Sequence, residues 1–453
     1  MKKILVYVVT FVCLLLMAGL VTSCDKKLTV LGEDSSNLNA LDELKDSYED
    51  THDVRIVYRP NSFEVAAEKA NQDFMHHTGI YDIVLQYNFS LTSYVRNNYV
   101  YNVDSLLKLA DKDVNIAFEK DLYPNAWKEV GYYYEDPIHH QTEKLQKVGY
   151  PFATNTMLLV YNKRMFENPE NKAAFYRKYK KELKVPTTWE QYEEIAHFFT
   201  TGNSFGVCMQ GATGSWLYYE YCDFLYGMNG SVFDKKHGWE GEFDTRITIT
   251  SDSAMKATER YMRILRNCNK GNFLSVDATE QVKLIKEGDV AMGLVWSDYL
   301  YSFLQEPFDH IFGFAPIPGD KSPIAGGCYY VNKDSEQPRE AANYILYLMQ
   351  PDVQVKLALK GLCSPLRSTY TNPKVKKEIL YADALAKSLE RGSYMFEAGL
   401  EATLVSDIIT NHIQRMWKNE KLTAKEILLQ IERDIESGRK DIYRNDEQSL
   451  FVK

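Results

Sequence analysis

The first part of the chain alternates short apolar runs with amphipathic segments. The apolar runs at residues 28–31, 54–58 and 81–85 have the length and composition of β-strands. Residues 39–50 and 62–74 between them are predicted to form helices, since they are rich in helix formers and keep apolar side chains on one face. This order of strands and helices predicts a parallel sheet covered by helices.

The same alternation continues through the rest of the chain. Further strands are predicted at residues 156–161, 205–209, 290–295 and 312–317. Further helices are predicted at residues 188–200, 216–226, 253–267 and 341–349, and almost without interruption from Ala382 onward. The chain is longer than one core usually supports, and no Pro-, Gly- or Ser-rich linker divides it. We therefore expect an α/β protein with two lobes that the chain crosses between more than once.

The N-terminus has the pattern of an export signal. Lys2 and Lys3 precede an apolar stretch at residues 4–20, and Val-Thr-Ser-Cys follows at residues 21–24. These four residues resemble a bacterial lipobox, which implies a signal peptide at residues 1–23 and lipidation of Cys24. The apolar stretch is short for a transmembrane anchor. We expect a protein held at the outer face of the cell membrane, or in the periplasm, by its lipid alone.

Composition narrows the possible functions. The net charge is −9 and no basic stripe is present, which excludes nucleic acid as a partner. Aromatic residues are dense, with 32 Tyr, 21 Phe and 6 Trp, so that some are available to line a cleft as well as a core. Outside the N-terminal segment the cysteines are scattered and do not form a disulfide framework, although Cys208 and Cys222 remain a candidate pair.

The motifs of common enzymes and metal sites are incomplete in this sequence. Residues 202–206 match G-x-S-x-G, but in a helix–turn–strand order that does not expose the serine. The segment beginning at Asp111 lacks the glycine and glutamate of a calcium loop. The histidine pairs at residues 76–77 and 139–140 do not predict a metal site. We expect no cofactor, no metal and no enzymatic activity, with a polysaccharide-acting hydrolase or lyase as the alternative.

Nine short segments occur in an order that resembles the family 1 extracellular solute-binding proteins, which include the maltose-binding protein. They lie at residues 28–30, 81–85, 150–152, 159–163, 186–189, 286–292, 314–319, 326–327 and 361–365. The resemblance covers nearly the whole chain after the signal segment. Val290 replaces an alanine of the family pattern, and residues 132–146 depart from its spacing.

The resemblance implies two α/β lobes with a ligand cleft between them and a helical C-terminal part. The first lobe would comprise residues 24–153 and 315–365. The second lobe would comprise residues 154–314 and 366–453. The chain would cross between lobes near residues 153–157, near residues 313–316 and near Pro365.

Ligands of open α/β sheets bind at the loops that follow the strands. These loops carry carboxylates and amides that suit hydroxyl groups, together with aromatic rings that suit the apolar face of a sugar. The candidate ligand-binding residues are Glu33, Asp34, Asn37, Gln86, Tyr87, Asn88, Asn155, Gln210, Trp216, Trp296 and Asp298. Tyr394 and Phe396 are expected to add an aromatic wall. Trp296 follows an apolar strand and is expected at the cleft, where it would contribute little to the stability of the hydrophobic core.

The expected function is capture of a carbohydrate-like solute by lobe closure and its delivery to the permease of an ABC importer. The same fold could instead act as a ligand sensor for a membrane kinase. Within the fold a polyamine or ferric ion is a further possible ligand, because Tyr218–Tyr219 and Tyr329–Tyr330 are adjacent tyrosines. Adjacent residues on a helix or strand diverge, which disfavours iron.

Overall fold

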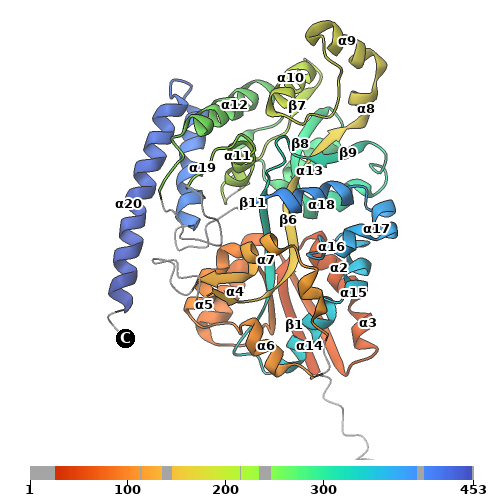
Figure 1. The fold of residues 1–453 in the computed structure, drawn as a ribbon, viewed down its shortest axis with the longest axis vertical. Helices are drawn as coiled ribbons and strands as arrows, with labels where there is room; N and C mark the ends of the chain where they lie inside the picture. Colours follow the sequence, from red (N-terminus) through yellow and green to blue (C-terminus); the bar gives the residue numbers. More distant parts are fainter. Residues whose placement is uncertain are drawn as a thin grey trace, which may run out of the picture.

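The computed structural model describes residues 26–112, 115–134, 145–214, 216–233, 246–394 and 402–450. The chain forms an α/β fold in which one long strand, β6 (Tyr150–Asn162), runs between two groups of elements (Figure 1). The sheet order is β2-β1-β3-β10-β6-β8-β7, with β9 paired to β6 and β11 paired to β10.

The first group of elements confirms the strands and helices predicted near the start of the chain. Its strands β1 (Lys26–Glu33), β2 (Val54–Asn61) and β3 (Ile83–Tyr87) are parallel. Apolar side chains on these strands are buried because helices cover the sheet. The helices of this group are α2 (Ser36–Leu44), α3 (Asp46–Glu49), α4 (Phe63–His76), α5 (Leu91–Arg96), α6 (Val103–Leu109), α7 (Pro124–Gly131), α14 (Pro338–Leu348) and α15 (Pro351–Ala358).

The second group contains the strands β7 (Phe205–Val207), β8 (Val290–Trp296) and β9 (Phe312–Pro316). Its helices include α10 (Trp189–Phe199), where Thr188 and Gln191 form the capping box that the sequence predicts. The other helices on this side are α8 (Lys163–Glu167), α9 (Pro169–Tyr179), α11 (Trp216–Gly227), α12 (Asp252–Cys268), α13 (Ala278–Lys286), α19 (Ala402–Lys418) and α20 (Ala424–Leu450). Figure 1 shows α19 and α20 lying beside α11 and α12, with which they share one hydrophobic core.

Strand β6 connects the two groups physically. Residues 150–156 pair with β10, and residues 157–162 pair with β8 and β9. Twelve of its 13 residues are buried, which is typical of a strand covered on both faces. Three short helices, α16 (Arg367–Thr371), α17 (Pro373–Glu378) and α18 (Ala382–Arg391), lie beside this junction.

Strand β10 (Pro323–Val331) is an element that the sequence patterns did not predict. It pairs antiparallel with both β3 and β6, so it lies in the middle of the sheet. Gly326 and Gly327 give this stretch the look of a turn, but here they allow close backbone approach. A Cβ at Gly327 would lie 2.2 Å from the carbonyl oxygen of Gln86.

Residues 132–146, which depart from the family spacing, include strand β4 (Tyr132–Tyr134) and the first residues of β5 (Leu145–Lys147). These two strands pair antiparallel in a sheet of their own. The five cysteines of the described residues are buried and none forms a disulfide, so the candidate Cys208–Cys222 disulfide is not present. Within the described ranges, no helix combines the length and apolar character needed to span a bilayer.

Candidate functional site

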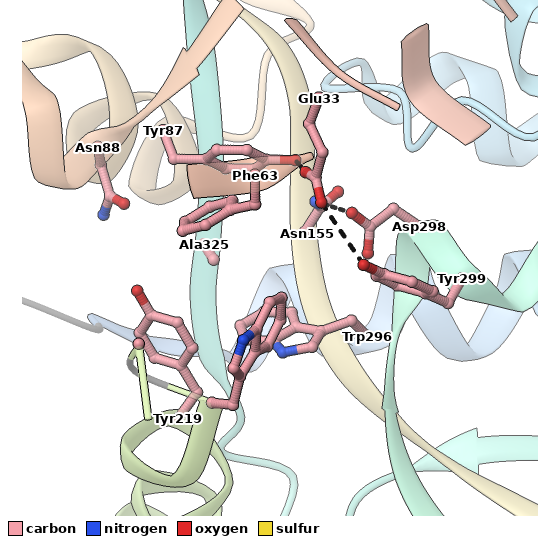
Figure 2. A pocket seen from close by; sticks show the side chains of 12 residues that line it. Glu33, Phe63, Tyr87, Asn88, Asn155, Tyr219, Trp296, Asp298, Tyr299 and Ala325 are labelled. Atoms are coloured by element: carbon pink, nitrogen blue, oxygen red, sulfur yellow. Dashed lines mark hydrogen bonds between the residues drawn. The ribbon is translucent and has the colours of Figure 1, made fainter. Parts of the chain in front are cut away.

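A cavity lies where the two groups of elements meet. Figure 2 shows side chains from both groups pointing into it. The lining residues are Glu33, Phe63, Tyr87, Asn88, Asn155, Gly214, Trp216, Tyr219, Trp296, Asp298, Tyr299 and Ala325.

Strand ends position most of these side chains. Glu33 and Tyr87 are the last residues of β1 and β3, and Trp296 is the last residue of β8. Asp298 and Tyr299 follow in the 3₁₀ segment η6 (Ser297–Leu304). The cavity therefore lies at the carboxyl ends of strands from both groups, which is where open α/β sheets bind ligands.

Two carboxyl groups form the polar centre of the cavity (Figure 2). The Tyr87 hydroxyl donates to one oxygen of Glu33, and the Tyr299 hydroxyl donates to the other at 3.5 Å. The Asn155 side-chain amide donates to Oδ2 of Asp298 at 3.1 Å. Glu33 thus binds groups from β3 and η6, and joins the two sides of the cavity.

Burial determines the protonation of this pair. Loss of solvent, and then the charge of Asp298, raise the pKa of Glu33 to about 8. Burial also raises the pKa of Asp298 to about 7. Because two like charges in one site resist joint ionisation, the pair retains a proton near neutral pH.

Aromatic rings form the walls. Figure 2 shows Phe63 and Tyr87 on one side of the cavity and Tyr219 and Trp296 on the other. The Phe63 and Tyr87 ring centroids are 5.4 Å apart. The Tyr219 and Trp296 rings meet edge to face at 5.3 Å. Trp216 also reaches Phe63, with centroids 5.8 Å apart.

Several buried polar atoms of the lining have no hydrogen-bond partner in the described part of the chain. They are Oδ1 of Asn88, Oδ1 of Asn155 and Nε1 of Trp296, together with Oδ1 of Asp298 apart from its own backbone amide. Buried polar groups normally find partners. Four such atoms around one cavity indicate groups that a bound ligand would satisfy.

Many of the residues expected from the sequence to bind ligand line this cavity. They are Glu33, Tyr87, Asn88, Asn155, Trp216, Trp296 and Asp298. Trp296 is, however, only 5% exposed and belongs to the hydrophobic core of the second group. The expectation that it has little weight in the core is therefore wrong: β8 extends one residue further than predicted and carries the ring inside.

Four expected residues lie outside the cavity. Asp34 is exposed and accepts a bond from Asn39 at 3.4 Å. Asn37 is buried, and its Oδ1 accepts the backbone N–H of Cys363 at 2.9 Å, so it fixes a loop. Gln86 precedes Tyr87 on β3 and points to the other face of the sheet, because strand side chains alternate.

Gln210 is fully buried and does not line the cavity. Its backbone N–H donates to Glu220, and its side chain donates to Gln281 at 2.8 Å. Tyr394 lies on β11 (Ser393–Tyr394), whose backbone pairs with β10. The structure describes the backbone of Tyr394 but not its side chain. Phe396 and Cys24 fall outside the described residues.

Three aromatic lining residues were missed in the sequence. Phe63 begins α4, and Tyr299 directly follows Asp298 in η6. Tyr219 lies three residues after Trp216 on α11, a spacing that puts both on one helix face. That spacing is the one signal that could have identified Tyr219. Gly214 and Ala325 also line the cavity.

The cavity offers no obvious metal site. Within the described ranges, no three His, Cys, Asp or Glu side chains are grouped to hold an ion. Tyr218 is buried, whereas its neighbour Tyr219 lines the cavity, so the two hydroxyls do not act together. Tyr329 and Tyr330 are both buried in β10.

Solved structures share this fold over most of their length. The solute-binding protein of an ABC transporter from Agrobacterium radiobacter K84, in complex with ribitol, has a TM-score of 0.73 at 18% identity, covering 91% of this chain and 98% of that one. Maltose-bound MalE3 of T. maritima has a TM-score of 0.72 at 17% identity, covering 90% and 99%. The sugar-binding protein MalE of Xanthomonas citri has a TM-score of 0.68 at 17% identity, covering 92% and 99%.

These likenesses show that the chain has the two-lobed α/β fold of periplasmic binding proteins. No curated protein sequence matches the chain. A family model described as bacterial extracellular solute-binding protein matches residues 43–382. That match spans well over half of the sequence and assigns solute binding, not catalysis. The chain belongs to the bacterial extracellular solute-binding protein family.

Proposed function

We propose that this protein captures a sugar or sugar alcohol in the cavity and delivers it to the permease of an ABC importer. One observation carries the proposal: paired carboxyl groups and unpartnered amide atoms lie between aromatic walls in one cavity. The polar atoms suit ring hydroxyls, and the aromatic rings suit the apolar face of a sugar. Binding of ribitol and maltose by proteins of the same fold supports this ligand class.

Capture would proceed by closure of two lobes around the solute. We assign residues 24–153 and 315–365 to one lobe, and residues 154–314 and 366–453 to the other. Contacts already cross this boundary, since Ser36 donates to the carbonyl oxygen of Asp298 and Tyr299 donates to Glu33. A solute that contacts both sides favours the closed form by its differential affinity.

The protein would act at the membrane through a lipid on Cys24. The Val-Thr-Ser-Cys sequence at residues 21–24 supports this anchor. A diacylated cysteine gives stable membrane attachment, because two acyl chains hold where one does not. The anchor would keep the receptor close to its permease.

The proposal is tested by thermal shift with a panel of neutral sugars, amino sugars and sugar alcohols, followed by calorimetry on the positives. A ligand at a hundredfold excess over its Kd stabilises the protein by about 2.7 kcal/mol, which raises Tm measurably. Radiolabelled uptake in cells lacking the gene then tests delivery. Absence of any Tm shift across the panel contradicts the proposed ligand class, and undiminished uptake in the deletion strain contradicts the transport role.

A further inference from the structure

We infer that the solute carries a protonated amine, which binds between Glu33 and Asp298, and that it is an amino sugar. The inference rests on the proposed function and specifies its substrate class. It follows from three features of the cavity: its uncompensated charge, its excess of acceptors and its aromatic walls.

Among the residues that the structure describes, the lining of the cavity is acidic and includes no compensating cation. None of its twelve lining residues is Lys, Arg or His. The charges of Asp298 and Glu64 both raise the pKa of Glu33, and within the described residues its hydrogen bonds come from the hydroxyls of Tyr87 and Tyr299. Buried charges are usually paired, because removal of an ion from water costs several kcal/mol.

The groups around Asp298 are also neutral or acidic. Its Oδ2 accepts a hydrogen bond from Asn155. Its charge contributes to the raised pKa values of the Cys363 thiol and the Tyr381 hydroxyl, both of which are neutral groups. Asp298 is 5% exposed, so bulk water does little to screen it. A ligand cation would therefore supply the missing positive charge.

Unpartnered acceptors point to a ligand rich in donors. Oδ1 of Asp298 and Oδ1 of Asn155 line the cavity without a partner other than the Asp298 backbone amide. The Asn155 amide orientation is fixed, because its nitrogen must face the Asp298 carboxylate. An ammonium group has three donors and no acceptor, which matches these atoms and Glu33.

The aromatic walls add to the attraction. Trp and Tyr ring faces attract cations through their quadrupole, most strongly where water is excluded. Trp296 and Tyr219 line the cavity together with Trp216. The same rings can cover the apolar face of a sugar ring, so an amine on a hydroxylated ring uses both properties of the walls.

Charge balance gives the inference a distinctive signature. Burial raises the pKa of both carboxyl groups, so that the empty site holds a proton near pH 7. An arriving ammonium group replaces that proton, which passes to the buffer. A neutral sugar keeps the proton in place as a hydrogen-bond donor. Calorimetry of one ligand in buffers of different ionisation enthalpy measures the proton released.

The experiment compares D-glucosamine and its β-1,4 disaccharide with N-acetyl-D-glucosamine, D-glucose and spermidine at pH 7. We expect the free amino sugars to bind at least tenfold more tightly than their neutral counterparts, with proton release. Equal or tighter binding of the neutral sugars overturns the amine but leaves the proposed function standing. Binding of spermidine alone contradicts a sugar as the solute but supports recognition of a protonated amine. Binding of none of these probes overturns the amino sugar, and the wider panel of sugars and sugar alcohols then decides the proposed function.

Variants locate the effect at the pair. Glu33→Gln keeps the side-chain size and removes the charge, and should lower amino-sugar affinity at least tenfold with less effect on any neutral sugar. Asp298→Asn is a second variant with the same expected outcome. Glu68→Gln is the matched control, because it removes a carboxylate from the exposed face of α4. Equal losses in Glu33→Gln and Glu68→Gln would overturn the assignment.

Discussion

Phe63 and Trp216 come from the two sides of the cavity, and their ring centroids lie 5.8 Å apart. Phe63 begins α4 in the first group, and Trp216 begins α11 in the second. Both rings are only partly buried. Phe63 belongs to neither hydrophobic core, and Trp216 packs against the edge of the second core while it also lines the cavity.

We expect Trp216→Ala to weaken solute binding about tenfold and to change the stability of the empty protein little. The aromatic contact is worth about 0.5–1.5 kcal/mol beyond burial, and lost contact with the ligand adds to it. Calorimetry and urea unfolding measure the two effects. Tyr176→Ala serves as control, since Tyr176 is an exposed aromatic residue on α9. Unchanged affinity in Trp216→Ala would contradict the role of this contact.

Trp296→Ala should behave differently from Trp216→Ala. Trp296 is 5% exposed within a hydrophobic core, and its ring also forms part of the cavity wall. Loss of a core Trp costs about 3–5 kcal/mol, so both the free energy of unfolding and the ligand affinity should fall. Urea unfolding of the empty protein provides the test. A stability equal to that of the unsubstituted protein would place the ring in the cleft alone.

The sequence predicted the α/β class because its strands are compact apolar runs. Strands β1 and β3 end within two residues of the end of their apolar runs. Their last residues, Glu33 and Tyr87, line the cavity. Strand β10 was not predicted, because Gly326 and Gly327 interrupt its apolar run and glycine is depleted in strands. Only its partners Gln86 and Ala153 show that glycine is needed for close packing.

Side-chain direction limited the prediction of the site. Asn37 follows β1 as expected for a ligand-binding residue, but it turns into the core to bind Cys363, 326 residues away in sequence. Gln86 and Tyr87 are neighbours on opposite faces of one strand, and only the second lines the cavity. The direction of a side chain depends on tertiary packing, which a local sequence pattern does not reveal.

Cys24→Ser tests the anchor. The substitution removes the acceptor of the lipid, so the protein should move to the soluble fraction or remain as an unprocessed precursor. Fractionation and intact-mass measurement distinguish these outcomes. Cys208→Ser is a matched control because Cys208 is a free, buried cysteine. Unchanged membrane association with normal processing of Cys24→Ser would contradict lipidation at this residue.

The stability of the empty protein should depend on pH through Glu33. Its pKa is raised from an ordinary value of 4.5 to about 8, so the folded state binds more protons than the unfolded state between these values. The free energy of unfolding then falls as pH rises through this window. Asp298 acts in the same direction between 3.8 and about 7.

Glu33→Gln should flatten this dependence. The substitution removes one of the two titrating groups of the pair, and it is the group whose pKa the charge of Asp298 helps to raise. Glu220 and Asp223 are buried with raised pKa values as well, but their contribution is common to both proteins and cancels in the comparison. Urea unfolding of the empty proteins at pH 5, 6, 7 and 8 gives the two slopes, and Glu68→Gln should keep the original one. Parallel curves for Glu33→Gln and the unsubstituted protein would mean that Glu33 ionises freely in the folded state. The acidic pair would then not hold the proton that an amine displaces.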